Sequence, residues 1–206
     1  MNTQRKNIIV FSFDDSIPFY KYKTVFNEPL ILPNLDKFCK ESTVFQSAYC
    51  QSPICGPSRA SFMSARTPHQ LGVFENRDDV FESISAKDMW LYQLKQNGYF
   101  CSSGGKVHHY YKPLPRRFHR VIYSDKQKYF RSDMNLPEDV VKIKYGGLRH
   151  GFGTPDENDD KIYYDHQSAD SAIEFIENYD RGEPFYREIG FYTPHGPRYT
   201  PARFKD

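Results

Sequence analysis

Apolar residues in this chain gather in short runs that polar, Gly- and Pro-containing segments separate, and these runs predict strands. The run from Asn7 to Phe13 ends directly in two carboxylates. A continuous apolar run of this length is typical of a strand buried in a mostly parallel sheet. Further runs predict strands at Thr43 to Tyr49, Tyr99 to Ser103 and Phe185 to Phe191.

Helical signals lie between these predicted strands. Pro33 to Phe38 starts with a Pro at a position typical of the first helical turn. Ser85 to Asn97 contains helix-forming residues, and Gly98 follows it as a left-handed stop. A later segment has apolar residues at i, i+3, i+4 and i+7, namely Ala169, Ala172, Ile173 and Ile176. The alternation predicts a single α/β unit with a mostly parallel central sheet flanked by helices.

Composition excludes some classes of partner. The 206 residues suffice for one domain with a core, and the formal net charge of +2 gives no electrostatic case for nucleic acid or membrane. The four cysteines form no CxxC pair, so they indicate neither a zinc site nor a disulfide framework. The polar N-terminus shows no signal region, which predicts a cytoplasmic protein, or a periplasmic or secreted one if a leader was removed.

The most informative motif is Cys-Gly-Pro-Ser-Arg, from Cys55 to Arg59, followed by small residues typical of a helix start. It places a sulfur at a helix N-terminus, where free backbone N–H groups and the helix dipole favour an anion. Arg59 lies four residues on, and therefore on the same helix face as Cys55. The alternative for a lone Cys55 is a small buried hydrophobe, which is the usual fate of a free cysteine.

With Arg66 downstream, this run resembles the signature of the formylglycine-dependent sulfatases of the alkaline phosphatase superfamily. The resemblance implies an alkaline-phosphatase-like sulfatase core and a formylglycine-generating enzyme that oxidises Cys55 to an aldehyde. In the hydrated aldehyde, one hydroxyl would attack sulfur and the other would later expel the sulfate. Arg59 would hold the diol and the developing charge.

Asp14 and Asp15 follow the first predicted strand, at the end where ligands collect in parallel sheets. Two adjacent carboxylates are costly to bury unless a cation neutralises them, and oxygen ligands favour Ca²⁺ or Mg²⁺. The alternative is a strand-end turn, where Asp is common. The resemblance implies that Asp14, Asp15 and Cys55 bind a divalent cation, with Ca²⁺ preferred.

A Gly-Gly-Lys-Val-His-His cluster follows the strand predicted to end at Ser103. By resemblance, Lys106 binds a sulfate oxygen and the formylglycine. Arylsulfatases and choline sulfatases carry Gly-Lys-x-His, which selects His108, whereas iduronate sulfatases carry Gly-Lys-x-x-His, which selects His109. Both histidines stay candidates, and later iduronate-sulfatase-like segments favour His109. Without the resemblance, a solvated surface loop would be expected.

The segment Thr193 to Pro197 follows the last predicted strand and resembles a family segment whose histidine binds the bridging oxygen or the sulfate. His195 would take that role. Arg187 and Glu188 interrupt the strand itself. Their burial would require a paired charge or an edge position.

The region from about 110 to 165 has few periodic signals, so we expect a long loop that carries specificity. Its basic residues would form a substrate-facing rim or a solvated face, and we favour the latter: Arg116, Arg117, His119, Arg120, Lys126 and Lys128. Gly151 to Asp156 resembles a segment of iduronate-sulfatase-type enzymes. Asp165-His166 resembles the family's second metal pair, but it precedes a helix and is interpreted as an N-terminal cap region.

The resemblance runs from Asn7 to Phe204 and lacks what the family supplies later: another metal-binding Asp, a further Lys for sulfate and a smaller C-terminal domain. Residues 1–206 are therefore expected to be the N-terminal part of a sulfatase catalytic domain, C-terminally truncated and weakly active or inactive alone. Asp14, Asp15 and Cys55 would offer fewer ligands than the six to eight oxygens that Ca²⁺ prefers.

Three functions stay open from sequence. The first is hydrolysis of a small-molecule or saccharide sulfate ester. The second is phosphonate or phosphate monoester hydrolysis within the same superfamily, and the third is an inactive remnant that binds anions. A cysteine hydrolase, with Cys55 as thiolate and His108, His109 or His195 as base, has little support because no orienting acid can be placed.

Overall fold

The computed structural model describes the chain in several stretches: residues 5–17, 23–24, 26–109, 114–126, 128, 141–145, 148–153, 161, 163–196, 198–199 and 203. Its contacts divide the chain into two compact units. One unit combines residues 1–15 with residues 51–206, and the other is residues 16–50, which contain helix α1 (Pro33–Lys40). The candidate site lies in the first unit.

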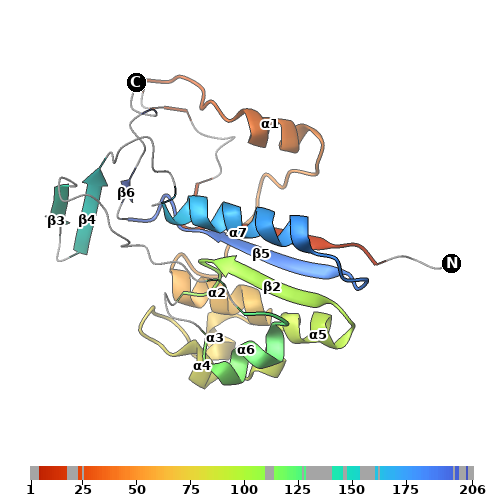
Figure 1. Ribbon diagram of the computed structural model, residues 1–206. Helices are drawn as coiled ribbons and strands as arrows, with labels where there is room; N and C mark the ends of the chain where they lie inside the picture. The colour runs from red at the N-terminus through yellow and green to blue at the C-terminus, as the bar shows by residue number, and fades with distance from the viewer. Residues whose placement is uncertain are drawn as a thin grey trace. The chain divides into compact units, whose positions relative to one another are not determined.

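The elements of the first unit follow one another as strands and short helices (Figure 1). In chain order they are β1 (Ile8–Phe13), α2 (Cys55–Ser64), α3 (Pro68–Leu71), α4 (Val80–Ser83), the 3₁₀ helix Ala86–Asp88, α5 (Trp90–Gln96), β2 (Phe100–Gly105), α6 (Arg116–Ile122), β3 (Val141–Tyr145), β4 (Leu148–Gly153), α7 (Tyr164–Asn178), β5 (Phe185–Phe191) and β6 (Arg198–Tyr199).

The central sheet is entirely parallel, which confirms the predicted fold class. Its strand order is β1-β5-β2, and Ile8 and Cys101 both align with Tyr186 of the middle strand. The strands predicted around residues 7–13, 99–103 and 185–191 are all present. Within the described residues, β3, β4 and β6 form a second small sheet.

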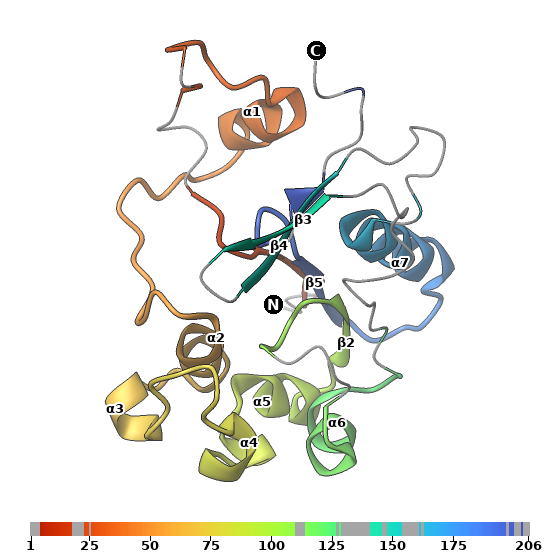
Figure 2. The same ribbon diagram turned by 90° about the vertical axis from the view of Figure 1, so that its left-hand side faces the viewer.

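Helices cover the central sheet from both sides (Figures 1 and 2). Helix α7 packs on one face against β5 and β2, while α2, α5 and α6 lie on the other. The largest core cluster belongs to the second face, where Met63, Met89, Leu91, Ile122 and Tyr186 are almost completely buried. No helix in the described part of the chain combines the length and apolar character needed to cross a bilayer.

Two predicted elements are wrong or altered. The range 43–49 forms no strand, and Phe45 and Tyr49 are largely exposed, so its apolar residues find no sheet partner among the described residues. The predicted helix at 85–97 is broken: Ser85 and Asp88 form a capping box around a short 3₁₀ turn, and α5 then starts afresh after an extended Met89. Gly98 has a φ of +79°, which confirms the left-handed stop.

Helix α7 confirms the periodic segment, but only part of the predicted face is packed. Ala172 is buried, as are Ser168 and Ser171, whereas Ile173 and Ile176 are about half exposed. Arg187 of β5 lies beside this face and donates hydrogen bonds to the carbonyl and hydroxyl oxygens of Ser171. A polar contact thus replaces part of the apolar packing that was expected here.

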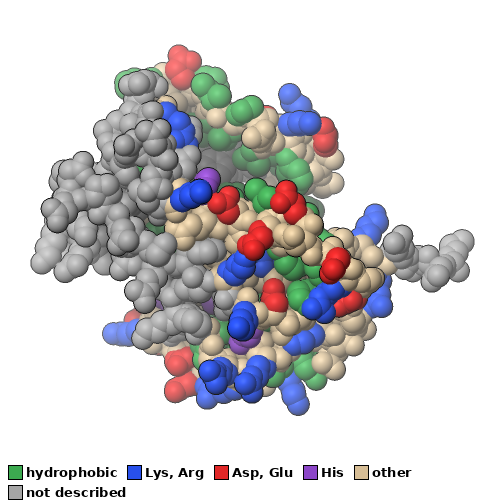
Figure 3. All heavy atoms as spheres, in the orientation of Figure 1, with side chains coloured by type: hydrophobic (Ala, Val, Ile, Leu, Met, Phe, Trp, Pro, Cys, Tyr) green, Lys and Arg blue, Asp and Glu red, His purple; other side chains and the backbone are tan. Residues whose placement is uncertain are grey.

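The range from about 110 to 165 is less loop-like than expected, since it holds α6 and the antiparallel pair β3 and β4. In α6, Phe118 and Ile122 are buried and the arginines point outward. Figure 3 shows basic side chains gathered over α6, and charges of both signs interspersed elsewhere on the described part of this face. Of the segments expected at 151–156 and 199–204, residues 154–156, 200–202 and 204 lie outside the described residues.

Arg187 and Glu188 sit in the middle strand and not at an edge, and both are buried. Arg187 donates to Ser102 Oγ at 2.6 Å and stacks over Phe175. Glu188 accepts a hydrogen bond from the Tyr186 hydroxyl at 2.8 Å, and burial raises its pKa to about 7. The two charges thus point to opposite faces, each with polar partners of its own.

Candidate active site

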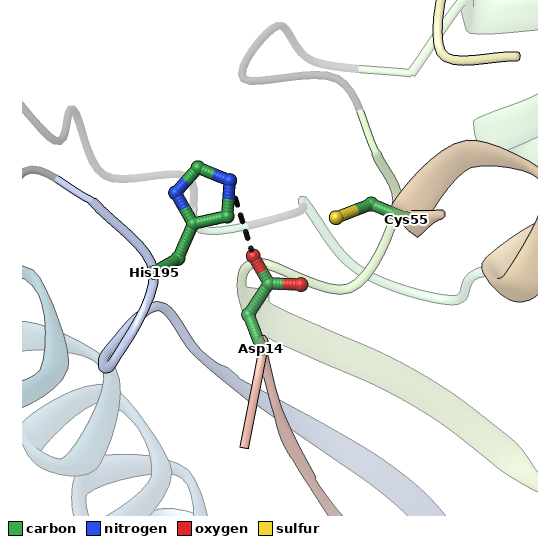
Figure 4. A group of neighbouring side chains, drawn as sticks. All are labelled: Asp14, Cys55 and His195. Atoms are coloured by element: carbon green, nitrogen blue, oxygen red, sulfur yellow. Dashed lines mark ion pairs between the residues drawn. The ribbon is translucent and has the colours of Figure 1, made fainter. Parts of the chain in front are cut away.

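The predicted site residues meet at one edge of the central sheet. Asp14 and Asp15 follow β1, Lys106 follows β2, and His195 follows β5. Because the three strands are parallel, their carboxyl ends lie at the same edge. The N-terminus of α2 brings Cys55 to this edge (Figure 4).

Asp14 is the centre of the cluster and is only 4% exposed. Its Oδ1 accepts a hydrogen bond from Arg59 Nη2 at 3.0 Å, and its Oδ2 pairs with Lys106 Nζ. Burial alone would raise the pKa of this carboxyl, but the hydrogen bonds and charges of Lys106 and Arg59 outweigh it and hold the pKa below its ordinary value. Asp14 is therefore a carboxylate at neutral pH.

Arg59 also fixes the loop that carries Lys106. Its Nη1 donates to the backbone carbonyls of Lys106 and Val107, at 2.7 and 2.8 Å. Lys106 is fully buried, with its ammonium 4.8 Å from the centre of the Tyr192 ring. Arg59, expected to hold the diol, and Lys106, expected to bind a sulfate oxygen, are thus held in place by Asp14 and by each other.

Glycines allow the end of β2, and Lys106 after it, to pack closely against β5. Gly105 has a φ of +79°, and a Cβ there would lie 2.1 Å from the carbonyl oxygen of Gly190. A Cβ on Gly190 would lie 2.1 Å from backbone atoms of Lys106. Side chains at either position would push Lys106 away from Asp14, so the glycines are required by the close approach.

Cys55 and His195 complete the cluster. One ligand atom each from Asp14, Cys55 and His195 lies within 4.8 Å of the other two. His195 Nε2 is 3.9 Å from a carboxylate oxygen of Asp14 and also 3.9 Å from one of Asp15, which is half exposed. Figure 4 shows the three labelled side chains pointing toward a common space.

The surroundings of Cys55 favour the neutral thiol over the thiolate. Burial, and then the negative charge of Asp14, raise the pKa of this thiol. A cysteine hydrolase needs a lowered thiol pKa, usually from an adjacent histidine or another cation. The environment of Cys55 therefore counts against the cysteine-hydrolase interpretation.

The structure separates His108 from His109. His108 is buried, its Nε2 lies 3.0 Å from the Tyr123 hydroxyl, and burial lowers its pKa to about 3. His109 is partly exposed, and its pKa is lowered by burial and then by the positive charges of Lys106 and Arg59. The charge of Arg59 acts on both histidines, but His109 is also within reach of Lys106 and is partly exposed, whereas His108 is bound within the core.

The first turn of α2 offers fewer free N–H groups than the motif suggests. The Gly56 N–H donates to Asn76 Oδ1 at 2.7 Å, Pro57 has no N–H, and the Ser58 N–H donates to the Ile54 carbonyl at 2.9 Å. The predicted backbone cradle for an anion is thus largely occupied. The positive charge at this site therefore comes mainly from the side chains that contact Asp14.

Two structural contacts near the site were missed from the sequence. Asp165 accepts hydrogen bonds from the backbone N–H groups of Tyr192 and Thr193, at 2.5 and 3.0 Å, and so positions the segment that leads to His195. Asn76 caps α2 from a separate turn. Local sequence signals place an acid near a helix start, but they do not identify a partner many residues away.

Two other residues from the sequence interpretation lie outside the cluster. His166 is paired with Asp170 at i+4, at 3.3 Å, on the side of α7 that is partly exposed. Arg66 pairs with Asp88 at 3.0 Å and links α2 to the 3₁₀ turn. Both contacts are structural and neither residue contacts the Asp14 cluster.

Comparisons with known proteins identify the family of this chain. The family model described as Sulfatase matches residues 6–206. A sulfatase of Formosa agariphila is 30% identical over 84% of this chain and 36% of its own length, and the iduronate 2-sulfatase of Mus musculus is 26% identical over 98% and 37%. A solved structure of BT4656 in complex with its substrate D-glucosamine-2-N,6-O-disulfate superposes with a TM-score of 0.58 at 22% identity, covering 93% of this chain and 35% of that one.

The chain thus spans little more than a third of the length of each of these three relatives. The matched part contains the parallel sheet, the Cys55 motif and the cluster around Asp14. Because the family model matches nearly the whole chain, this chain belongs to the sulfatase family.

Proposed function

We propose that this chain binds the sulfate group of a sulfate ester and provides the nucleophile for its hydrolysis. The observation that carries the proposal is the cluster in which Asp14, Cys55 and His195 bring ligand atoms within 4.8 Å of one another, beside Arg59 and Lys106. Its members come from four separate elements, so the fold and not local sequence brings them together.

The donor set fits a divalent cation. Asp14 and Asp15 offer carboxylate oxygens, which suit Ca²⁺ or Mg²⁺. A thiol at position 55 suits such hard cations poorly, whereas an oxygen of a hydrated formylglycine would suit them well. When bound, the cation would stabilise negative charge on the sulfate and on the attacking oxygen.

Arg59 and Lys106 would stabilise the charge that develops on the sulfate oxygens. Both are pre-organised, because Asp14 and the loop carbonyls already fix their positions. Pre-organised donors in a site with little water stabilise a transition state more strongly than mobile surface cations do. This role requires that their contacts with Asp14 leave part of each donor set available to the substrate.

His109 and His195 are the proposed proton-transfer residues, and His108 is not. His195 is 30% exposed and its Nε2 faces the two carboxylates, so it can reach a substrate oxygen at the cluster. His109 has a lowered pKa and is largely neutral near pH 7, in which state one ring nitrogen donates and the other accepts. His195 would protonate the leaving alcohol oxygen, whereas a neutral His109 would donate a hydrogen bond to a substrate oxygen or accept a proton from it.

The proposed substrate class is a saccharide sulfate ester. The related structure of BT4656 holds a sulfated glucosamine, and iduronate 2-sulfatase is named for a sulfated sugar acid. The chain corresponds to about a third of the length of these proteins. Hydrolysis of a sulfate ester by this chain alone is therefore a proposal, and it does not follow from membership of the family.

Mass spectrometry of the Cys55 peptide tests the proposal directly. The chain would be expressed with a formylglycine-generating enzyme, and exchange of the sulfur for a carbonyl oxygen is the expected result. Turnover of an aryl sulfate would then be compared with turnover of an aryl phosphonate. An intact Cys55 thiol after co-expression, or a preference for the phosphonate, would contradict the proposal.

A further inference from the structure

A second pocket lies on the sheet face that α7 covers. Its volume of about 390 Å³ falls in the range of roughly 300–1,000 Å³ that small ligands use. Its lining comes from β2, β5, α7 with the turn after it, and the segment that carries Asp125 and Lys128. The pocket shares no residue with the Asp14 cluster, whose helix α2 packs on the other face of the sheet (Figure 1).

The segment with Asp125 and Lys128 is fixed along β2. The Ser124 N–H donates to the Cys101 carbonyl at 2.8 Å, and the Gly105 N–H donates to the Lys128 carbonyl at 3.1 Å. In the described sheet β2 is an edge strand, so this segment runs along its outer side. Its side chains can therefore line a pocket together with α7.

One wall of the pocket holds a buried cation and a carboxylate that share a hydroxyl. Arg187 is only 2% exposed and donates to Ser102 Oγ at 2.6 Å, and Ser102 Oγ donates to Asp125 Oδ2 at 2.7 Å. Arg187 Nε and Asp125 Oδ1 are buried too, and neither has a hydrogen-bond partner among the described residues. A donor and an acceptor without partners thus lie on neighbouring side chains of the pocket, and leaving such groups unpaired is costly.

The rim offers a second couple of donor and acceptor. Lys128 forms an ion pair with Glu174 of α7, and both side chains are partly exposed. Phe175 and Tyr179 also line the pocket, with ring centres 5.2 Å apart. The pocket therefore combines two couples of cation and carboxylate with apolar ring surface.

The charges around the pocket cancel. It is lined by three cations and three carboxylates, namely Arg187, Lys128, Arg181, Asp125, Glu174 and Asp180. An anion would face the three carboxylates, and a cation would face the three positive groups. A hydroxyl group is uncharged and both donates and accepts, so it matches each couple without disturbing this balance.

We propose that this pocket is a binding site for a neutral saccharide. Its hydroxyl groups donate to Asp125 and Glu174 and accept from Arg187 and Lys128, and an apolar face of the sugar ring lies against Phe175. The site needs neither a sulfate group nor a modified Cys55, so the inference goes beyond the proposed function and does not depend on it.

The test is an NMR titration with four unsulfated disaccharides: lactose, maltose, cellobiose and chitobiose. The backbone amides of Phe175 and Asn178 would report binding. Glu174→Ala and Lys128→Ala each remove one member of the exposed couple. The matched controls are Glu177→Ala, on the same helix, and Lys126→Ala, in the same segment, because both side chains are exposed and neither lines the pocket.

We expect at least one disaccharide to shift both amides of the wild type. Glu174→Ala and Lys128→Ala should each weaken its binding by roughly five- to tenfold, the size of one lost hydrogen bond. Both controls should match the wild type. A neutral ligand loses affinity in both variants, whereas a charged ligand would lose it in one and gain it in the other.

Three results would overturn the inference. The first is that none of the four disaccharides shifts Phe175 and Asn178. The second is that inorganic sulfate or trialanine shifts these amides and the sugars do not, which would identify an anion or peptide site. The third is that the two variants change the dissociation constant in opposite directions. Failure of the proposed function would be seen separately, at the Cys55 peptide and in turnover of the aryl sulfate.

Discussion

Replacing Asp14 with Asn would strand two cations at the centre of the site. Lys106 is fully buried and Arg59 is 13% exposed, and both pair with Asp14. Removing one partner of a buried ion pair typically costs about 3–5 kcal/mol, because the remaining charge stays buried without compensation. We expect the free energy of unfolding of Asp14→Asn to fall by roughly this amount, a large share of the 5–15 kcal/mol typical of domains.

Urea denaturation followed through the fluorescence of Trp90 would measure the change, since this tryptophan packs against Tyr186 in the core. Asp15→Asn is the matched control, because it makes the same chemical change on a half-exposed neighbour. Exposed charges contribute little, so its effect should stay under about 1 kcal/mol. An Asp14→Asn protein within about 1 kcal/mol of the wild type would refute the argument.

A second variant tests the stated cause. Lys106→Met in the Asp14→Asn background removes the stranded ammonium, so part of the lost stability should return.

The destabilisation by Asp14→Asn also depends on pH. The pKa of Asp14 is lowered in the folded state, so its stabilisation is present above the unfolded pKa of about 3.9 and is lost as the pH falls through the folded value. The gap between wild type and Asp14→Asn should therefore narrow in acid.

Three further predictions concern other parts of the site and core. His108→Ala should lower the unfolding temperature, whereas His109→Ala should leave it nearly unchanged and weaken sulfate binding; the reverse pattern would assign the site role to His108. The folded pKa of Glu188 is about 7, above its unfolded value, so the stability that Glu188 contributes should be lost as pH rises from 5 to 8. Because the buried histidines add an opposite slope to both proteins, the measured quantity is the difference in unfolding free energy between wild type and Glu188→Gln, which should shift against the wild type over this range in urea titrations. A difference that does not change with pH would contradict the assignment. Gly105→Ala should lower the free energy of unfolding by about 3 kcal/mol or more, because of backbone strain and steric clash. Gly182→Ala, with open space around it, should not lower it.

The apolar runs predicted the central sheet because parallel strands are buried on both faces and carry a continuous signal. Because the three strands are parallel, their carboxyl ends lie at the same edge of the sheet. The meeting of Asp14, Lys106 and His195 at this edge could therefore be predicted from the strands alone. The run at 43–49 carries a similar signal, yet it forms no strand. Apolar character alone does not reveal whether a pairing partner exists.

Contacts between distant segments could not be predicted in the same way. Nothing local indicates that Asn76 accepts the Gly56 N–H, or that Asp165 accepts the N–H groups before His195. The choice between His108 and His109 also needed the fold, because both follow Lys106 and both fit a family spacing. Their different burial arises from Tyr123 and the core, which the sequence of the loop does not contain.

The charges at the site explain why a cation is part of the proposed function. Two carboxylates, Asp14 and Asp15, are balanced by two cations, Arg59 and Lys106, which already contact Asp14. The occupied N–H groups at the start of α2 add little further positive potential. A sulfate ester would bring an uncompensated negative charge into this balanced and partly buried cluster, which is costly. A divalent cation bound to the two carboxylates would more than offset that charge. It would also weaken the ion pairs of Asp14 with Arg59 and Lys106, so that their N–H groups can donate to the sulfate oxygens.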